Sequence, residues 1–190
     1  MHFDLEFTSI ILAGGQSSRM GEDKALVPYN GKPLILYSIG LSLNFSDKII
    51  ISSDQESHTS LGFPVVPDIY PVHAPIAGIH AGLKSSATDW NLVLSCDMPN
   101  ISSQVIDYLL SNLDDKSEIV LPQHDGYLEP LCGFYHKSLI PLMESNFTKN
   151  LLSPLDLLGS APHRIIRMDD LPGKNMSFVF RNVNSRNDLL

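Results

Sequence analysis

The sequence has few cysteines, and those it has are isolated. Only 2 of its 190 residues are cysteines, Cys96 and Cys132, each in an apolar stretch and without CxxC spacing. A disulfide scaffold is therefore excluded, and two buried free thiols are favoured over a redox or metal site. A chain of this length buries enough surface to fold without crosslinks.

Basic residues and long hydrophobic runs are also scarce. The chain has 13 Lys and Arg against 21 Asp and Glu, a formal charge of -8, and its basic residues are scattered. This argues against a surface for duplex nucleic acid or anionic membranes, so any bound anion must be held locally. No apolar run reaches the ~18 residues of a membrane span, and Asp4 and Glu6 stand where a signal peptide would be basic. We expect a cytoplasmic protein.

Strand-like and helix-like segments alternate through the first half of the chain. Short apolar runs typical of buried strands cover residues 8–12, 48–52, 64–66 and 91–95. Helical patterns follow Pro33, span 76–86 and begin after Ser102. This alternation predicts an α/β fold of three αβα layers around a mostly parallel sheet, with the site at the carboxyl ends of the strands.

The second half is less regular. Strand-like segments at 118–121 and 131–135 flank the turn signal Asp125-Gly126, which predicts an antiparallel element. Further strands are predicted at 163–168 and 178–183. No repeat or linker marks a boundary, so we expect one domain over residues 1–190, with a nucleotide-binding half at about 1–100.

The loop after the first strand, LAGGQSSRMGEDK at residues 12–24, concentrates groups that bind phosphate. Two glycines leave backbone N–H groups uncovered, two serines add hydroxyls and two basic residues add charge. These residues are Gly14, Gly15, Ser17, Ser18, Arg19 and Lys24. The spacing matches neither GxGxxG nor GxxxxGK[ST], which argues against a Rossmann dinucleotide site and a Walker-type ATPase. A polyphosphate ligand is favoured over a solvated surface turn.

Residues 12–34, LAGGQSSRMGEDKALVPYNGKPL, resemble the signature loop of nucleotidyltransferases with a GT-A-like, Rossmann-like fold, and among them the molybdenum cofactor guanylyltransferases. Further matches follow in order at Val66-Pro67-Asp68, Ala74-Pro75-Ile76-Ala77-Gly78, Cys96-Asp97-Met98-Pro99, Glu129-Pro130-Leu131 and Asn182-Val183-Asn184. The resemblance implies transfer of GMP from GTP to the phosphate of molybdopterin or the molybdenum cofactor, with Mg²⁺ and release of pyrophosphate. It also implies an acceptor-side half at about 101–190.

The resemblance assigns roles to individual residues. Arg19, Lys24 and Asp97 are expected to be catalytic, with Asp97 also the metal ligand, since a carboxylate directly after a buried strand is a suitable hard ligand. The expected nucleotide-binding residues are Leu12, Ala13, Gly14, Gly15, Lys24, Ser52, Asp68, Gly78 and Asp97. Asn182 and Asn184 are expected on the acceptor or metal side.

Other functions stay open. One is the cytidylyl branch of the molybdopterin enzymes, or a nucleotidyltransferase acting on another phosphate acceptor such as a sugar phosphate. Another is a non-catalytic nucleotide-binding protein that delivers the cofactor, against which Lys24 and Asp97 together argue. The chain departs from the family pattern at His73-Ala74-Pro75, where Gly-Pro is usual, and at Ser52, where Asn is common. Transient contacts with proteins of cofactor biosynthesis or molybdoenzyme maturation are also expected.

Overall fold

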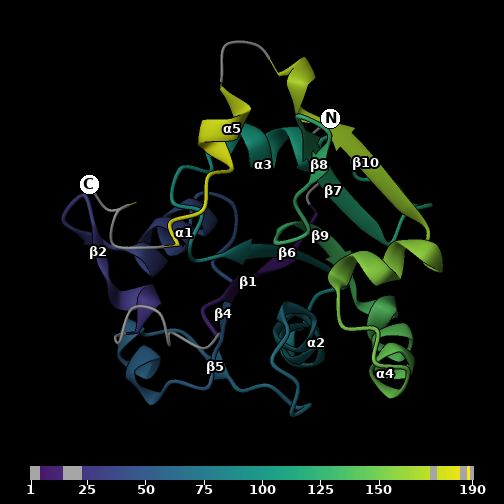
Figure 1. Ribbon diagram of the computed structural model, residues 1–190, viewed down its shortest axis with the longest axis horizontal. Coiled ribbons are helices and arrows are strands. Elements are labelled where there is room, and N and C mark those ends of the chain that lie inside the picture. The colour runs from purple at the N-terminus through teal and green to yellow at the C-terminus, as the bar shows by residue number, and fades with distance from the viewer. Residues whose placement is uncertain (1–4, 15–22, 172–174, 185–187, 189–190) are drawn as a thin grey trace.

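The computed structural model describes residues 5–14, 23–171, 175–184 and 188. Its centre is an eight-stranded sheet with the order β10-β7-β9-β6-β1-β4-β5, in which β8 pairs with β7, and a separate two-stranded sheet joins β2 and β3 (Figure 1). The strands are β1 Phe7–Leu12, β2 Pro28–Tyr29, β3 Lys32–Pro33, β4 Ile49–Ser52, β5 Val65–Val66, β6 Trp90–Ser95, β7 Ile119–His124, β8 Tyr127–Leu128, β9 Cys132–His136 and β10 His163–Arg167. The helices are α1 Leu34–Ser42, α2 Pro75–Ser85, α3 Ser103–Leu110, α4 Ile140–Thr148 and α5 Met176–Val179.

The sheet is mostly parallel, with its antiparallel part in the second half of the chain, as predicted. The neighbours β5, β4, β1 and β6 run parallel, and β10 runs parallel to β7. The strand β9 lies antiparallel to both β6 and β7. The turn between β7 and β8 has positive φ at Asp125 (48°) and Gly126 (81°), the conformation that a two-residue hairpin requires.

Helices cover both faces of the sheet, which confirms the predicted three layers (Figure 1). Successive residues of β1 point to opposite faces. Ile10 packs in a cluster with Ile79 of α2, and Met143 of α4 belongs to the same cluster. Ile11 packs on the other face with Ile35 of α1. The two apolar clusters hold α2 and α1 against opposite faces of β1.

One predicted strand, at residues 178–183, is wrong. The segment begins inside the short helix α5, Met176–Val179, and continues without regular structure. The Asn175 side chain accepts from the Phe178 N–H and caps this helix. Met176, Val179 and Phe180 are buried in the cluster that contains α3. Their spacing of three and four residues places them on one face of a helix. Burial of this face favours a helix over the strand that the apolar residues of the segment had suggested.

Both cysteines are buried and free, as predicted. Burial is the main cause that raises the pKa of the Cys96 thiol to about 12, and it raises the pKa of Cys132 above its usual range as well. Thiols held in the neutral form in this way are poor nucleophiles and poor metal ligands.

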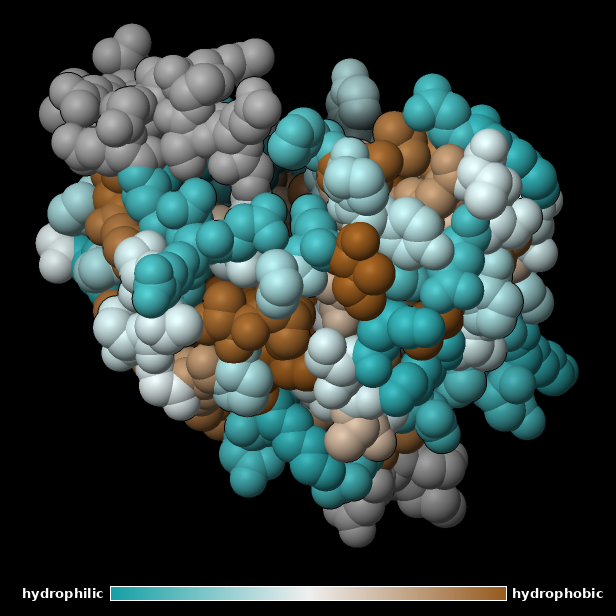
Figure 2. All heavy atoms as spheres, turned by 90° about the horizontal axis from the view of Figure 1, so that it is seen from below, coloured by the Kyte–Doolittle hydropathy of each residue, from teal (hydrophilic) through white to brown (hydrophobic). Residues whose placement is uncertain are grey.

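Figure 2 shows the face seen from below, on the side of α2 and α4. Apolar side chains appear there in small groups between hydrophilic ones. Among the residues that the structure describes, no helix is long and apolar enough to cross a membrane.

We expect Gly82→Ala to destabilise the fold by about 1–3 kcal/mol, the usual effect of overpacking a core. A Cβ at Gly82, in α2, would lie 2.5 Å from Cγ2 and 2.8 Å from Cδ1 of the buried Ile10. Gly40→Ala, in α1, is the matched control, because a Cβ there meets nothing closer than the Lys32 Nζ at 3.5 Å. That change should stabilise the protein by about 0.5–1 kcal/mol through helix propensity. Urea unfolding measures both, and equal stability of the two variants would contradict the packing of α2 on β1.

Candidate functional site

The candidate site lies at the carboxyl ends of the central strands. Leu12 pairs with Ser52 on β4 and with Ser95 on β6, so the three strands end level with one another. Backbone hydrogen bonds continue past these ends. The Ala13 N–H donates to the Ser52 carbonyl at 3.0 Å, and the Cys96 N–H donates to the Leu12 carbonyl at 3.1 Å. The loops that follow the three strands therefore share one edge of the sheet.

The structure brings three of the residues that were predicted to bind the nucleotide, Leu12, Ser52 and Asp68, together around Gly78 of α2. A Cβ at Gly78 would lie 2.7 Å from the Ser52 Oγ and 3.1 Å from the Leu12 Cδ2. It would lie 3.6 Å from the Asp68 Oδ1. A Cβ at Gly14 would lie 3.8 Å from the Ser52 carbonyl oxygen, which places the start of the glycine-containing loop beside the same residues. A Cβ at position 78 would therefore force Ser52 and Leu12 to move, whereas it would only make ordinary van der Waals contact with Asp68.

Asp68 is a carboxyl group with an altered acidity at this edge. Its pKa is raised from 3.8 to about 6, first by burial and second by the nearby charge of Asp54, and His73 partly opposes the shift. The Asp54 carboxylate also accepts from the Asp68 backbone N–H at 3.2 Å. Asp68 therefore changes charge close to neutral pH, where a ligand that donates hydrogen bonds would favour its ionised form.

The departure from the family pattern at Ala74 does not strain the backbone. Ala74 is the N-cap of α2 and has φ -145° and ψ 145°, an extended conformation that any residue adopts. Pro75 follows at the first position of the helix, where proline is well tolerated. The backbone conformation thus does not require glycine at position 74.

Lys24, Asp97 and Asn184 meet at the same edge of the sheet. The Lys24 Nζ lies 2.7 Å from the Asp97 Oδ2 and donates to the Asn184 Oδ1 at 3.0 Å. The side chains of Lys24 and Asp97 are 24% and 19% exposed, so a substrate can reach both. Asn182 is exposed as well, but it is Asn184 whose amide contacts the lysine. The C-terminal segment therefore reaches Lys24 through Asn184, whose expected role on the acceptor or metal side stays a prediction.

Two further hydrogen bonds fix the orientation of Asp97. The Ser95 hydroxyl donates to the Asp97 Oδ1 at 2.5 Å, while the Val183 N–H donates to the Asp97 carbonyl at 2.8 Å. The hydrogen bond from Ser95 holds the Asp97 carboxylate in one orientation. The hydrogen bond from Val183 joins the loop after β6 to the C-terminal segment. The residue patterns did not reveal the role of Ser95, although its place two residues before Asp97, at the end of a strand, was a usable signal.

The oxygen atoms at this edge suit a hard cation that arrives with phosphate. In the described part of the chain, no three His, Cys, Asp or Glu side chains gather as a set of metal ligands. Mg²⁺ does not need such a set, because it commonly takes one or two carboxylates together with substrate phosphates and water. Asp97 and Asn184 both accept from the same ammonium group, so positive charge is stabilised between their oxygens. The donor set therefore fits Mg²⁺.

Some predicted site residues cannot be placed. Gly15 and Arg19 lie outside the described residues, as do Ser17 and Ser18. Their expected contacts with phosphate remain predictions.

A buried histidine, His58, is a second feature that the sequence did not reveal. It lies in the 3-10 helix Glu56–Leu61, and its Nε2 is 2.8 Å from the Oδ2 of Asp23, the residue before Lys24. Asp23 in turn accepts from the Ala25 N–H at 3.1 Å and caps the 3-10 turn Lys24–Leu26. Residues 23 and 58 are far apart in the chain, so no local pattern links them.

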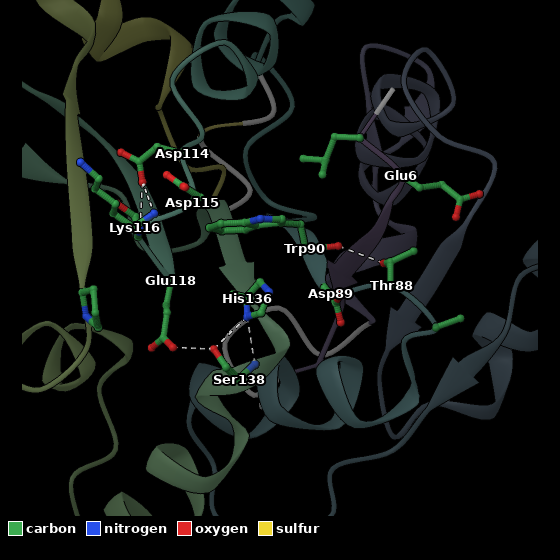
Figure 3. A pocket seen from close by; sticks show the side chains of 14 residues that line it. Glu6, Thr88, Asp89, Trp90, Asp114, Asp115, Lys116, Glu118, His136 and Ser138 are labelled. Carbon is green, nitrogen blue, oxygen red and sulfur yellow. Dashed lines mark hydrogen bonds between the residues drawn. The ribbon is translucent and has the colours of Figure 1, made fainter. Parts of the chain in front are cut away.

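The hollow shown in Figure 3 is not the candidate site, although its volume is about 750 Å³. It lies at the opposite edge of the sheet, among residues that precede β1, β6, β7 and β10. One lysine, Lys116, and five acidic side chains line it. The acidic residues are Glu6, Asp89, Asp114, Asp115 and Glu118. This charge would repel a polyphosphate.

Comparison with known proteins shows to which family the chain belongs. The family model described as "MobA-like NTP transferase domain" matches residues 9–155. A probable molybdenum cofactor guanylyltransferase of Flavobacterium johnsoniae is 32% identical over 182 residues, which cover 96% of this chain and 94% of the relative. A molybdenum cofactor guanylyltransferase of Vibrio atlanticus is 39% identical over 140 residues, 72% of each chain.

Solved structures share the fold. The molybdopterin-guanine dinucleotide biosynthesis protein A of Archaeoglobus fulgidus has a TM-score of 0.80 at 24% identity, covering 96% of this chain and 95% of that protein. A putative protein of Aquifex aeolicus has a TM-score of 0.78 at 27% identity, with 94% of each chain covered. The length of the family match, the level of identity and the agreement of the folds lead to one conclusion: the chain belongs to the family of MobA-like NTP transferase domains.

Proposed function

We propose that this protein transfers GMP from GTP to the phosphate of molybdopterin or of the molybdenum cofactor and releases pyrophosphate. The observation that carries the proposal is the contact of Lys24 with Asp97 and Asn184, next to the residues around Gly78. Relatives that cover most of the chain bear the name of this activity.

The reaction needs charge stabilisation and no protein nucleophile. An oxygen of the acceptor phosphate forms a bond to the α-phosphorus of GTP, and the bond from that phosphorus to the bridging oxygen breaks. The bonding electrons leave with pyrophosphate. Lys24 is placed to stabilise the negative charge that builds on the phosphates, because its ammonium group is already directed to this edge by Asp97 and Asn184.

We assign Mg²⁺ to the oxygens of Asp97 and Asn184. When bound, the metal ion would neutralise phosphate charge and act as a Lewis acid. Ser95 would keep the Asp97 carboxylate turned toward the ion through its hydrogen bond to Oδ1. The hydrogen bond from Val183 to the Asp97 carbonyl would keep Asn184 beside it.

In this proposal, the guanine base of GTP binds beside the residues around Gly78. A carboxylate accepts hydrogen bonds, and the edge of guanine offers N–H donors, so Asp68 suits guanine when it is ionised. Glycine at position 78 lets Ser52 and Leu12 approach the backbone of α2 closely, with Asp68 beside them, and this keeps Ser52 and Asp68 together at the edge where we propose that the base lies.

We expect GTP to outcompete CTP and ATP clearly, by several powers of ten in kcat/KM, because a mismatched base leaves buried polar groups unpaired. The test incubates the protein with Mg²⁺, molybdopterin and each of the four NTPs, and measures pyrophosphate. A preference for CTP, or equal use of GTP and CTP, would favour the cytidylyl alternative. Release of pyrophosphate only with a sugar phosphate would move the activity to another acceptor.

Asp97→Ala should abolish pyrophosphate release and leave the thermal midpoint nearly unchanged, since a partly exposed carboxylate at a strand end contributes little packing. Asp107→Ala provides the control, because Asp107 is an exposed carboxylate on α3 outside the site. An active Asp97→Ala enzyme would exclude Asp97 as the metal ligand.

Asp68 should make the KM for GTP depend on pH. Below a pKa of about 6 the carboxyl group is neutral, so the KM should rise about 10-fold between pH 7 and pH 5, as the ionised fraction falls. Stability should change in the opposite sense: the folded protein binds the proton more tightly than the unfolded chain, so its stability falls as pH rises from about 4 to 6. Asp68→Asn should remove both effects. Titration of GTP itself affects the wild type and the Asp68→Asn variant equally, so the comparison of the two removes it. If the variant shows the same dependence of KM on pH as the wild type, Asp68 does not contact the base.

A further inference from the structure

The carboxylate of Asp23 is held at both of its oxygens. Its Oδ1 accepts from the Ala25 N–H at 3.1 Å, which caps the turn Lys24–Leu26. Its Oδ2 lies 3.2 Å from the Ser57 Oγ and 2.8 Å from the His58 Nε2. The residue that begins the turn of Lys24 is thus tied to the 3-10 helix Glu56–Leu61, which lies between β4 and β5.

The contacts of His58 define which of its ring nitrogens carries a proton. The Gln55 N–H donates to the Ser53 Oγ at 3.0 Å, and the Ser53 Oγ lies 2.8 Å from the His58 Nδ1. A hydroxyl that accepts from Gln55 is free to donate its own hydrogen to Nδ1. With Nδ1 as the acceptor, the N–H of the ring is on Nε2, which faces the Asp23 carboxylate at 2.8 Å.

Packing alone does not explain His58. Its side chain is fully buried, and burying an imidazole costs free energy unless its nitrogens find partners. Its Nε2 lies 2.8 Å from the Asp23 Oδ2, at an angle that departs from a straight hydrogen bond. His80 differs: it is also buried, but its Nε2 contacts Glu144 at 3.2 Å, between α2 and α4 and away from Lys24.

We infer that His58 is a positioning residue for nucleotidyl transfer, which holds Asp23 so that Lys24 is directed to the phosphates. The sequence of contacts runs from Ser53, just after β4, through His58 and Asp23 to the turn that carries Lys24. The inference rests on the proposed function for the role of Lys24. A lysine that acts on charge built up in the transition state must be held accurately, because misplacement by about 1 Å can cost ~10²-fold in rate.

Two conservative variants separate the contacts of His58. The amide nitrogen of Gln can occupy the place of Nε2 and keep the donor to Asp23, whereas the amide oxygen of Asn can occupy the place of Nδ1 and keep only the hydrogen bond from Ser53. Both lose similar packing. We expect His58→Asn to lower kcat for pyrophosphate release by about 10-fold or more with a smaller change in the KM for GTP, and His58→Gln to stay within about threefold of the wild type. Equal losses in the two variants, or no loss in either, would overturn the inference.

A double-mutant cycle tests whether His58 acts through Asp23. The Asp23→Asn variant and the Asp23→Asn, His58→Asn double variant should show the same loss of kcat, because the second change has nothing left to remove. Additive losses would contradict the inference. The matched control is His80→Asn, which removes a buried histidine elsewhere and should keep kcat within about twofold.

Hydrogen exchange at the Ala25 amide provides a readout independent of activity. His58→Asn should speed its exchange and His58→Gln should not, with the thermal midpoints of the two variants compared in parallel. If the wild-type protein releases no pyrophosphate with any NTP, the proposed function fails, and the Ala25 exchange still decides whether His58 holds Asp23. Unchanged exchange in His58→Asn would refute that role.

Discussion

The contact of Lys24 with Asp97 is the interaction on which the candidate site depends. Together with Asn184 it joins the beginning, the middle and the end of the chain at one point. An ion pair that is about one-fifth exposed contributes little to stability, on the order of 0–1 kcal/mol. In the function proposed above, its importance lies in placing one positive charge beside two oxygen atoms at the carboxyl ends of the strands.

The topology of the sheet determines why these residues meet. The chain passes from β1 to β4 on one side, and β6 later pairs with β1 on the other side. Ligands of α/β folds bind outside the carboxyl ends of the strands at such a reversal of strand order. Leu12 lies at this point, with Ser52 and Ser95 as its neighbours. The antiparallel strand β9 ends at the opposite edge of the sheet, beside the acidic hollow. The two edges therefore differ in charge: acidic side chains line the hollow, whereas Lys24 lies at the carboxyl ends of the parallel strands.

Local patterns sufficed for much of the fold and for part of the site. Lys24 and Asp97 were singled out by their positions in the glycine-containing loop and directly after a strand, whereas Asp68 was assigned only through the family resemblance. His58 was not, since its partner Asp23 is distant in sequence and only the fold brings them together. The strand predicted at 178–183 failed for a related reason. The cap at Asn175 and the burial of Met176 and Val179 against α3 decide that segment, and neither is visible from alternation alone.

An acidic protein that binds a polyphosphate must neutralise its own carboxylates at the site. Three of them do so in different ways. Asp97 contacts the ammonium of Lys24, and Asp23 is held by the Ala25 N–H and His58. Asp68 instead has a pKa near 6, so its charge is easily removed. Each carboxylate at this edge thus has a negative charge that is compensated or easily removed, which reduces the repulsion that a chain with a formal charge of -8 would exert on an anion.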